Sequence, residues 1–228
     1  MENQLKEIFG ALIAAIGTIT SAIGSTPFYF ISSNVRENLN IYGNTLQAVG
    51  NALEADGQDE ISLEKIGNEI QSIGNVTVIS GLVIDFADET KVKLVIYGNL
   101  AQALGGLTAL ADEFEDTSDK DEYFNVVGNL LQAIGNSLQA IGGIYELKSI
   151  RTDRQDSKEN LVNDTGENLD NQANSEPDKK KEGQSIDIIG SWIQAHAHQL
   201  KDGYKTKFCS FELKSPQMGG FIKNKHAK

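Results

Sequence analysis

Few residues in this chain could carry chemistry, and most of them lie near its C-terminal end. All three histidines and the one cysteine, Cys209, follow Ala195. His196 and His198 stand two positions apart, a spacing that does not place side chains on the same face of a helix. A single cysteine cannot form a disulfide within the chain. The usual nucleophile–base pairs need a histidine or cysteine, so we expect no catalytic residue and no metal ligand in residues 1–195.

An acidic run from Asp112 to Glu122 is the other feature that could bind a cation. It lacks the central glycine and the ligand order of an EF-hand loop, so we interpret it as a solvated connector. The glycine pairs at 105–106 and 142–143 do not extend into a GxGxxG or GxxxxGK[ST] motif, which phosphate-binding loops require. The sequence therefore predicts no cofactor, and we expect the protein not to be an enzyme.

The charge of the chain argues against nucleic acid as a partner. The formal net charge is −12, and residues 1–150 carry 7 Lys and Arg against 20 Asp and Glu. An acidic surface repels phosphate groups. Residues 201–228 reverse this balance, because they carry 7 Lys against 2 acidic residues.

Glycines recur at intervals of seven residues throughout the first 150 residues, within the repeated sequence Gly-Asn-x-Leu-Gln-Ala-apolar. Glycine in a helix interior costs about 1 kcal/mol relative to alanine, so close helix packing must recover this cost. We therefore expect the following glycines to be helix-packing residues: Gly10, Gly17, Gly43, Gly50, Gly67, Gly74, Gly98, Gly105, Gly128, Gly135 and Gly142.

The repeats predict an all-α fold, an antiparallel helical bundle built from internal repeats of about 30 residues. Gly43, Gly67, Gly98 and Gly128 open successive units 24, 31 and 30 residues apart, and helices joined by short connectors usually lie antiparallel. We expect five helices in residues 1–150. Asn34 and Glu37 are the expected N-terminal cap of the second helix.

The remaining residues are expected to form three further parts. Residues 151–184 are rich in charged and amide side chains and too poor in apolar ones to offset the entropy of ordering; we predict a disordered acidic linker. Residues 185–200 resume the repeated pattern as a returning helix. The pattern ends at His196, and residues 201–228 form a basic tail. Residues 196–228 are either a divergent tail or one replaced by a frame disruption or fusion.

The repeated sequence also predicts which side chains face the bundle. With glycine at heptad position a, the leucine at d and the apolar residue at g form one continuous arc that ends at the glycine. Gln at e and Asn at b form an amide stripe beside it. We expect the large apolar side chains to fill the space around the glycines. The amides would bond to carbonyls or to each other, either inside one bundle or between the chains of a homo-oligomer.

Residues 8–35 contain no charged side chain, a length that would suffice for a membrane span. Because this segment shares the glycine register, we interpret it as a bundle helix and expect a cytoplasmic protein. A membrane helix and a secretory signal remain as alternatives, although the N-terminal charges do not form the basic leader of a signal.

Residues 76–97 present a second ambiguity. Their β-branched segments, 76–84 and 91–97, would form a β-hairpin by propensity alone. The glycine register runs through both segments, and we therefore predict helix.

The run from Gly128 to Gly142, the segment from Gly10 to Pro27 and the segment 190–195 resemble a group of repetitive proteins from Bacillus-like bacteria. This resemblance implies a bacterial origin and a helical fold, and it implies no catalytic activity. The expected function is a non-enzymatic structural or self-associating role. The alternative is a membrane-active protein that inserts its uncharged N-terminal helix, a contact that the acidic body does not favour.

Overall fold

A computed structural model describes the backbone of residues 2–112, 120–162 and 176–212, and the side chains of residues 2–112, 123–155 and 179–201. The described chain is helical apart from short connectors, which confirms the predicted all-α fold. Six helices follow one another: α1 (Glu2–Ser25), α2 (Ser33–Gly57), α3 (Leu63–Val83), α4 (Asp88–Asp112), α5 (Lys120–Val162) and α6 (Glu176–Glu212). The first five are the helices expected in residues 1–150, and α6 contains the expected returning helix.

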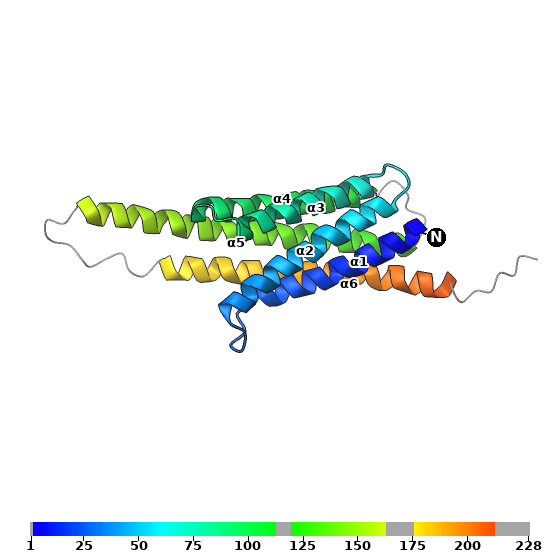
Figure 1. The fold of residues 1–228 in the computed structure, drawn as a ribbon, viewed down its shortest axis with the longest axis horizontal. Helices are drawn as coiled ribbons and strands as arrows, with labels where there is room; N and C mark the ends of the chain where they lie inside the picture. Colours follow the sequence, from blue (N-terminus) through cyan, green and yellow to red (C-terminus); the bar gives the residue numbers. More distant parts are fainter. Residues whose placement is uncertain (1, 113–119, 163–175, 213–228) are drawn as a thin grey trace, which may run out of the picture.

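The six helices form a closed ring. Each helix packs against the next one in the chain, and α6 packs against α1. In the described residues no other pair of helices brings its Cα atoms within 8 Å. The helices run antiparallel, and α5 and α6 extend beyond the others at one end (Figure 1). Only side chains therefore meet across the interior of the ring.

The ends of the helices follow local sequence signals. The Ser32 hydroxyl accepts a hydrogen bond from Val35 N, and the Ser62 hydroxyl accepts one from Lys65 N. These two serines cap α2 and α3, satisfying backbone N–H groups that the first helical turn leaves free. The predicted cap at Asn34 is wrong, because α2 already begins at Ser33.

The segment 76–97 is helical on both sides of a short turn, as predicted. α3 ends at Val83 and α4 begins at Asp88. Val92 and Ile96 pack with Ala140 of α5 in a small apolar cluster. Tertiary packing therefore outweighs the β propensity of these residues.

The described helices extend into the ranges predicted for the linker and the tail. α5 continues through Val162 and α6 begins at Glu176, so residues 151–162 and 176–184 are helical. Within the range predicted for the linker, only residues 163–175 lie outside the described helices. Within the range predicted for the tail, only residues 213–228 do. A solvated helix needs little apolar surface when its residues have good helix propensity, and Arg151 is held by Glu89 of α4 at 2.7 Å.

The inward face of the helices is rotated away from the predicted apolar arc, past the glycines and onto the amide stripe. Asn and Gln at b and e are buried together with the glycines and alanines, as Asn51 and Gln47 are at 2 % exposure. The apolar g position lies outside, as Val49 does at 47 % and Ile73 at 65 %. The prediction failed because it assumed that large apolar side chains define the core.

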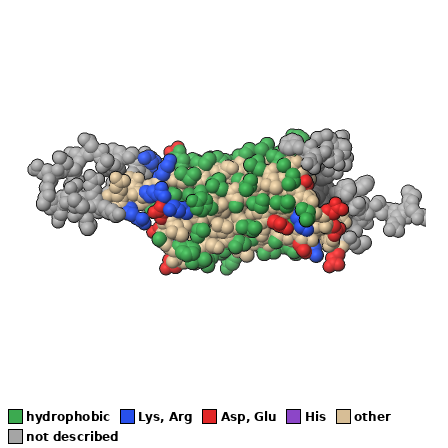
Figure 2. All heavy atoms as spheres, turned by 90° about the horizontal axis from the view of Figure 1, so that it is seen from above, with side chains coloured by type: hydrophobic (Ala, Val, Ile, Leu, Met, Phe, Trp, Pro, Cys, Tyr) green, Lys and Arg blue, Asp and Glu red, His purple; other side chains and the backbone are tan. Residues whose placement is uncertain are grey.

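The outer surface is accordingly apolar along the length of the ring. Figure 2 shows hydrophobic side chains spread over the face in view, with acidic and basic side chains gathered near its two ends. Each helix has an uncharged segment: residues 8–25 in α1, 38–53 in α2, 70–83 in α3, 94–111 in α4, 123–145 in α5 and 188–200 in α6. Among the described residues, every salt bridge lies outside these segments.

Candidate functional site: an amide-lined interior

The predicted helix-packing glycines lie where neighbouring backbones approach most closely. A Cβ atom at Gly10 would lie 2.6 Å from Gly50 O, and one at Gly50 would lie 2.6 Å from Gly10 O. Distances under 3.0 Å are not compatible with a real Cβ atom. The same reciprocal arrangement joins Gly17 with Gly43, Gly67 with Gly105, Gly74 with Gly98, Gly135 with Gly190 and Gly142 with Gly183.

The glycine pairs show that the chain is built from three similar hairpins, namely α1–α2, α3–α4 and α5–α6. The remaining predicted glycine, Gly128, faces α6 at the side chain of Lys201 and at Ala197 O, 3.2 Å from the position of a Cβ. Close contact within each hairpin turns the neighbouring b and e positions toward the interior of the ring.

Glutamine side chains from four helices meet in the middle of the ring. Gln194 Nε2 donates to Gln47 Oε1 at 2.8 Å and to Gln102 Oε1 at 3.3 Å, and Gln139 Nε2 donates to Gln194 Oε1 at 2.9 Å. This group, which we call the glutamine layer, connects α2, α4, α5 and α6. Hydrogen bonds between side chains therefore occupy the place of an apolar core.

A second group of amides lies beside the glutamine layer. Gln132 Nε2 donates to Gln71 Oε1 and lies 3.1 Å from His198 Nε2. His198 takes the heptad position of an asparagine, and Lys201 takes that of a glutamine; both side chains are 2 % exposed. The predicted end of the pattern at His196 is thus wrong, because other polar residues continue the inward face as far as Lys201.

Several interior amides have unused hydrogen-bonding groups. Among the described residues, ten buried side-chain atoms lack a partner: Asn51 Oδ1, Asn68 Nδ2, Gln71 Nε2, Asn75 Oδ1, Gln102 Nε2, Gln132 Oε1, and both Nδ2 and Oδ1 of Asn129 and Asn136. An unpartnered buried polar atom costs about 1–3 kcal/mol. The interior therefore has spare capacity to bind water or polar groups.

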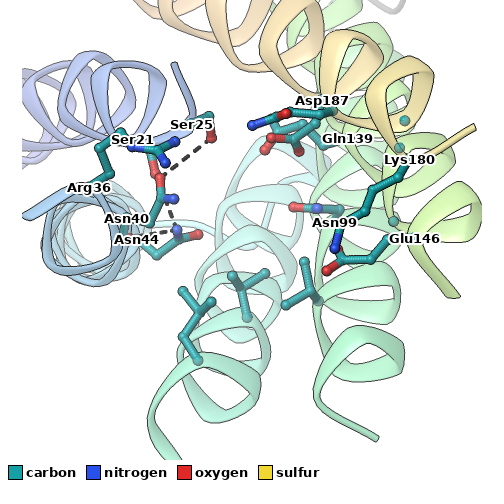
Figure 3. A pocket seen from close by; sticks show the side chains of 18 residues that line it. Ser21, Ser25, Arg36, Asn40, Asn44, Asn99, Gln139, Glu146, Lys180 and Asp187 are labelled. Atoms are coloured by element: carbon teal, nitrogen blue, oxygen red, sulfur yellow. Dashed lines mark hydrogen bonds between the residues drawn. The ribbon is translucent and has the colours of Figure 1, made fainter. Parts of the chain in front are cut away.

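A cavity of about 350 Å³ opens where α1 connects to α2, and residues of all six helices line it. Figure 3 shows Arg36, Asn40 and Asn44 on its α2 side, and Asn99, Gln139, Glu146, Lys180 and Asp187 on its α4, α5 and α6 sides. Its α2 wall is fixed by hydrogen bonds, because Asn44 Nδ2 donates to Ser21 Oγ at 3.2 Å and to Asn40 O at 2.8 Å. Gln139 connects this cavity to the glutamine layer.

Four charged side chains line the cavity, and all of them lie outside the uncharged segments. Burial raises the pKa of Asp187 to about 6; the hydrogen bond from Ser25 opposes this shift and the nearby charge of Glu146 adds to it. Burial also raises the pKa of Glu146, and the charge of Lys180 opposes that shift. Among the described residues, none of these carboxyl groups forms a salt bridge, and neither does Arg36 or Lys180.

The other residues considered from the sequence are not brought together. His196 is exposed, with Nδ1 2.8 Å from Trp192 O, whereas His198 is buried. In the described part of the chain, no three His, Cys, Asp or Glu residues are placed to hold a metal ion. The acidic run beyond Asp112 and the side chain of Cys209 lie outside the residues whose side chains the structure describes.

Sequence reasoning missed the cavity. Asp187 and Glu146 both occupy heptad position e, seven or fourteen residues from an inward-facing glutamine. A charged residue in a glutamine position was the signal that could have revealed them, and recognising it required knowing that the e position faces inward.

The structure thus defines a class: a closed, antiparallel ring of six helices with polar side chains inside and apolar side chains outside. A family model matches residues 5–200. The chain belongs to this family, which is described as a family of unknown function, DUF6944. No curated protein and no solved structure matches the chain significantly.

Within the residues that the structure describes, two helices, α1 and α4, are long and apolar enough to cross a membrane by length and composition. Half of each apolar window is buried inside the structure. Taken alone, two such helices are weak evidence, because the core helix of a soluble protein passes the same test.

Proposed function

We propose that the protein is a non-enzymatic, membrane-embedded helical ring. The observation that carries this proposal is the inverted distribution of side chains: amides lie inside, and large apolar side chains such as Ile73 and Leu104 cover the outside. Soluble monomers rarely expose large continuous apolar surfaces. A lipid bilayer is the solvent that matches such a surface.

The uncharged segments of α1, α4 and α5 are long enough to span a bilayer, as this proposal requires, whereas those of α2, α3 and α6 are shorter. The six segments contain 13 to 23 residues, or roughly 20 to 34 Å of helix at 1.5 Å per residue. The hydrocarbon core of a bilayer is about 30 Å thick. Salt bridges such as Lys6–Asp56 at one end and Lys91–Asp85 at the other would then lie near the two membrane surfaces.

The interior is also suited to a lipid environment. Helices in membranes associate through small residues that allow close approach and through hydrogen bonds between polar side chains. The reciprocal glycine pairs and the glutamine layer supply both kinds of contact.

The alternative is a cytoplasmic protein that associates with copies of itself, one of the two non-enzymatic roles expected from the sequence. In water, copies of the chain would have to cover the apolar outer surface of one another. The two proposals differ in what contacts Ile73 and its neighbours: lipid in the first, another protein chain in the second.

Membrane partitioning tests the proposal directly. The full chain would be expressed with its membranes, washed with alkaline carbonate and floated with liposomes, while light scattering measures the mass of any soluble fraction. We expect the chain to float, to resist carbonate and to need detergent for extraction. A soluble monomer would overturn both proposals, and a soluble oligomer that ignores liposomes would support self-association instead.

A pair of variants sharpens this test. Ile73→Glu places a charge at the middle of the outer surface of α3, and a charge at the centre of a membrane helix costs about 2.5–3.5 kcal/mol on insertion. Ile61→Glu is the matched control, because Ile61 is 85 % exposed but lies in the connector before α3. We expect only Ile73→Glu to reduce membrane incorporation. Equal incorporation of both variants would argue that the outer surface does not face lipid.

A further inference from the structure

We propose that the end cavity binds a small zwitterionic solute, one that carries an ammonium and a carboxylate group. The cavity presents charges of both signs from different helices: Asp187 and Glu146 from α6 and α5, and Arg36 and Lys180 from α2 and α6. This proposal does not depend on membrane insertion, because the cavity is formed within one chain.

The size of the cavity fits a small ligand. Binding sites for small molecules usually measure about 300–1,000 Å³, and this cavity, at about 350 Å³, lies near the lower limit. Apolar side chains of α3 and α4, Val78, Leu82 and Val95, complete its lining. A short aliphatic chain between two charged groups would contact these side chains.

The charged groups of the cavity lack partners that a zwitterion would supply. Arg36 and Asp187 are partly buried and Glu146 and Lys180 are exposed, and among the described residues none of the four takes part in a salt bridge. An ammonium group could donate hydrogen bonds to Asp187 and Glu146, and a carboxylate could accept a bidentate pair from Arg36. Two positive and two negative side chains leave no net charge to favour a simple cation or anion.

Asn99 provides an independent indication of a ligand. Its side chain is 4 % exposed and lines the cavity, where Figure 3 labels it together with the charged residues of the lining. An asparagine amide can donate two hydrogen bonds and accept two. A buried amide that lines the cavity is therefore positioned to bind either end of a zwitterion.

Calorimetric titration of the purified full chain tests the proposal with three probes of equal chain length: 4-aminobutyrate, butylamine and butyrate. The titration is run in detergent micelles, or in buffer if the chain proves soluble. We expect 4-aminobutyrate to bind at least tenfold more tightly than either singly charged probe. No binding of 4-aminobutyrate, or equal binding of one singly charged probe, would overturn the proposal.

Substitutions in the cavity test whether 4-aminobutyrate binds there. Asp187→Asn and Arg36→Gln should each weaken 4-aminobutyrate binding at least tenfold, whereas Lys93→Gln, which changes a salt-bridged residue outside the cavity, should leave it within twofold. Unchanged affinity in both cavity variants would place the ligand elsewhere and contradict the proposal. If a cavity variant fails to fold, the comparison of the three probes on the unmodified chain still tests whether the protein binds a zwitterion.

Discussion

Gln194 of α6 donates a hydrogen bond to Gln47 of α2 across the interior of the ring, over a distance of 2.8 Å between Nε2 and Oε1. The backbones of these two helices are not in contact with each other. The bond therefore belongs to the small set of side-chain contacts that connect helices which are not neighbours in the ring.

Gln47→Leu should destabilise the folded chain by about 1–3 kcal/mol, because it removes an acceptor from a buried donor. Gln194 Nε2 would retain only the longer bond to Gln102, at 3.3 Å. The measurement is the loss of helical circular dichroism during denaturant titration of the full chain in mild detergent.

Gln199→Leu is the matched control for this prediction. This substitution is chemically the same as Gln47→Leu, but the side chain of Gln199 is exposed. We therefore expect the free energy of unfolding to change by no more than about 0.5 kcal/mol. If Gln47→Leu proves as harmless as Gln199→Leu, the glutamine layer does not stabilise the ring.

Gly50→Ala separates close packing from helix propensity. A Cβ at residue 50 would lie 2.6 Å from Gly10 O and 2.6 Å from Ala14 N, and these backbone atoms can move only with α1. We expect a loss of about 1–3 kcal/mol, as overpacking typically causes. Propensity alone predicts a gain of about 1 kcal/mol. Thermal unfolding of the full chain distinguishes the two.

The reverse substitution, Ala52→Gly, provides the control two residues away. Ala52 is exposed, and the change should cost about 1 kcal/mol through helix propensity. A stabilised Gly50→Ala protein next to a destabilised Ala52→Gly protein would mean that propensity governs both sites. That result would refute the packing role of the glycine pairs.

The sequence was sufficient to predict the helices because glycine spacing is a local and repeated signal. The turn between Val83 and Asp88 illustrates this, since the register identified helix where β-branched residues indicated strand. The local sequence does not determine which face of each helix points into the ring. Whether Gln47 or Val49 points inward depends on the solvent outside the ring, and the sequence alone does not specify that solvent.

The cavity could not be predicted from the sequence for a related reason. Arg36 and Asp187 are 151 positions apart, and they share a cavity because α6 packs against α1 and closes the ring. The prediction of a disordered linker concealed this closure, because it treated residues 176–184 as separate from the returning helix.

Trp192 should report contact with lipid. Its indole Nε1 donates to Thr26 Oγ1 at 3.0 Å, near the end of α1, and its ring lines an apolar outer groove with Leu131 and Ile189. Because it is the only tryptophan in the chain, its fluorescence is unambiguous. Lipids brominated near the headgroup should quench it more strongly than lipids brominated near the bilayer centre, and aqueous acrylamide should quench it weakly.

A chain in which the tryptophan is moved, Trp192→Phe with Ile61→Trp, is the control for this measurement. Residue 61 lies in the connector between α2 and α3, so acrylamide should quench the relocated tryptophan readily. Strong acrylamide quenching of Trp192 itself, without any effect of brominated lipids, would show that its surface faces water.

The stability of the fold should decrease as pH rises from about 4 to about 6, through Asp187. Burial raises the pKa of this carboxyl from 3.8 to about 6, so the folded state retains a proton that the unfolded state has already released. The folded state therefore binds more protons in this range, and its stability falls as pH increases. The stability that the protonated Asp187 carboxyl contributes is largest below pH 3.8 and is lost as the pH rises past about 6.

Asp187→Asn should remove this dependence. Because one pKa unit corresponds to 1.36 kcal/mol, the variant should be more stable than the unmodified chain at pH 7.5, by at most about 3 kcal/mol, and equally stable below pH 4.

Glu89→Gln should behave in the opposite sense, since hydrogen bonds from Lys93 and Arg151 lower the pKa of Glu89 to about 2 and stabilise the fold only while the carboxylate is charged. Denaturant titrations of both variants between pH 3.5 and 7.5 check the two signs. A constant difference between Asp187→Asn and the unmodified chain across this range would show that Asp187 is not the titrating group.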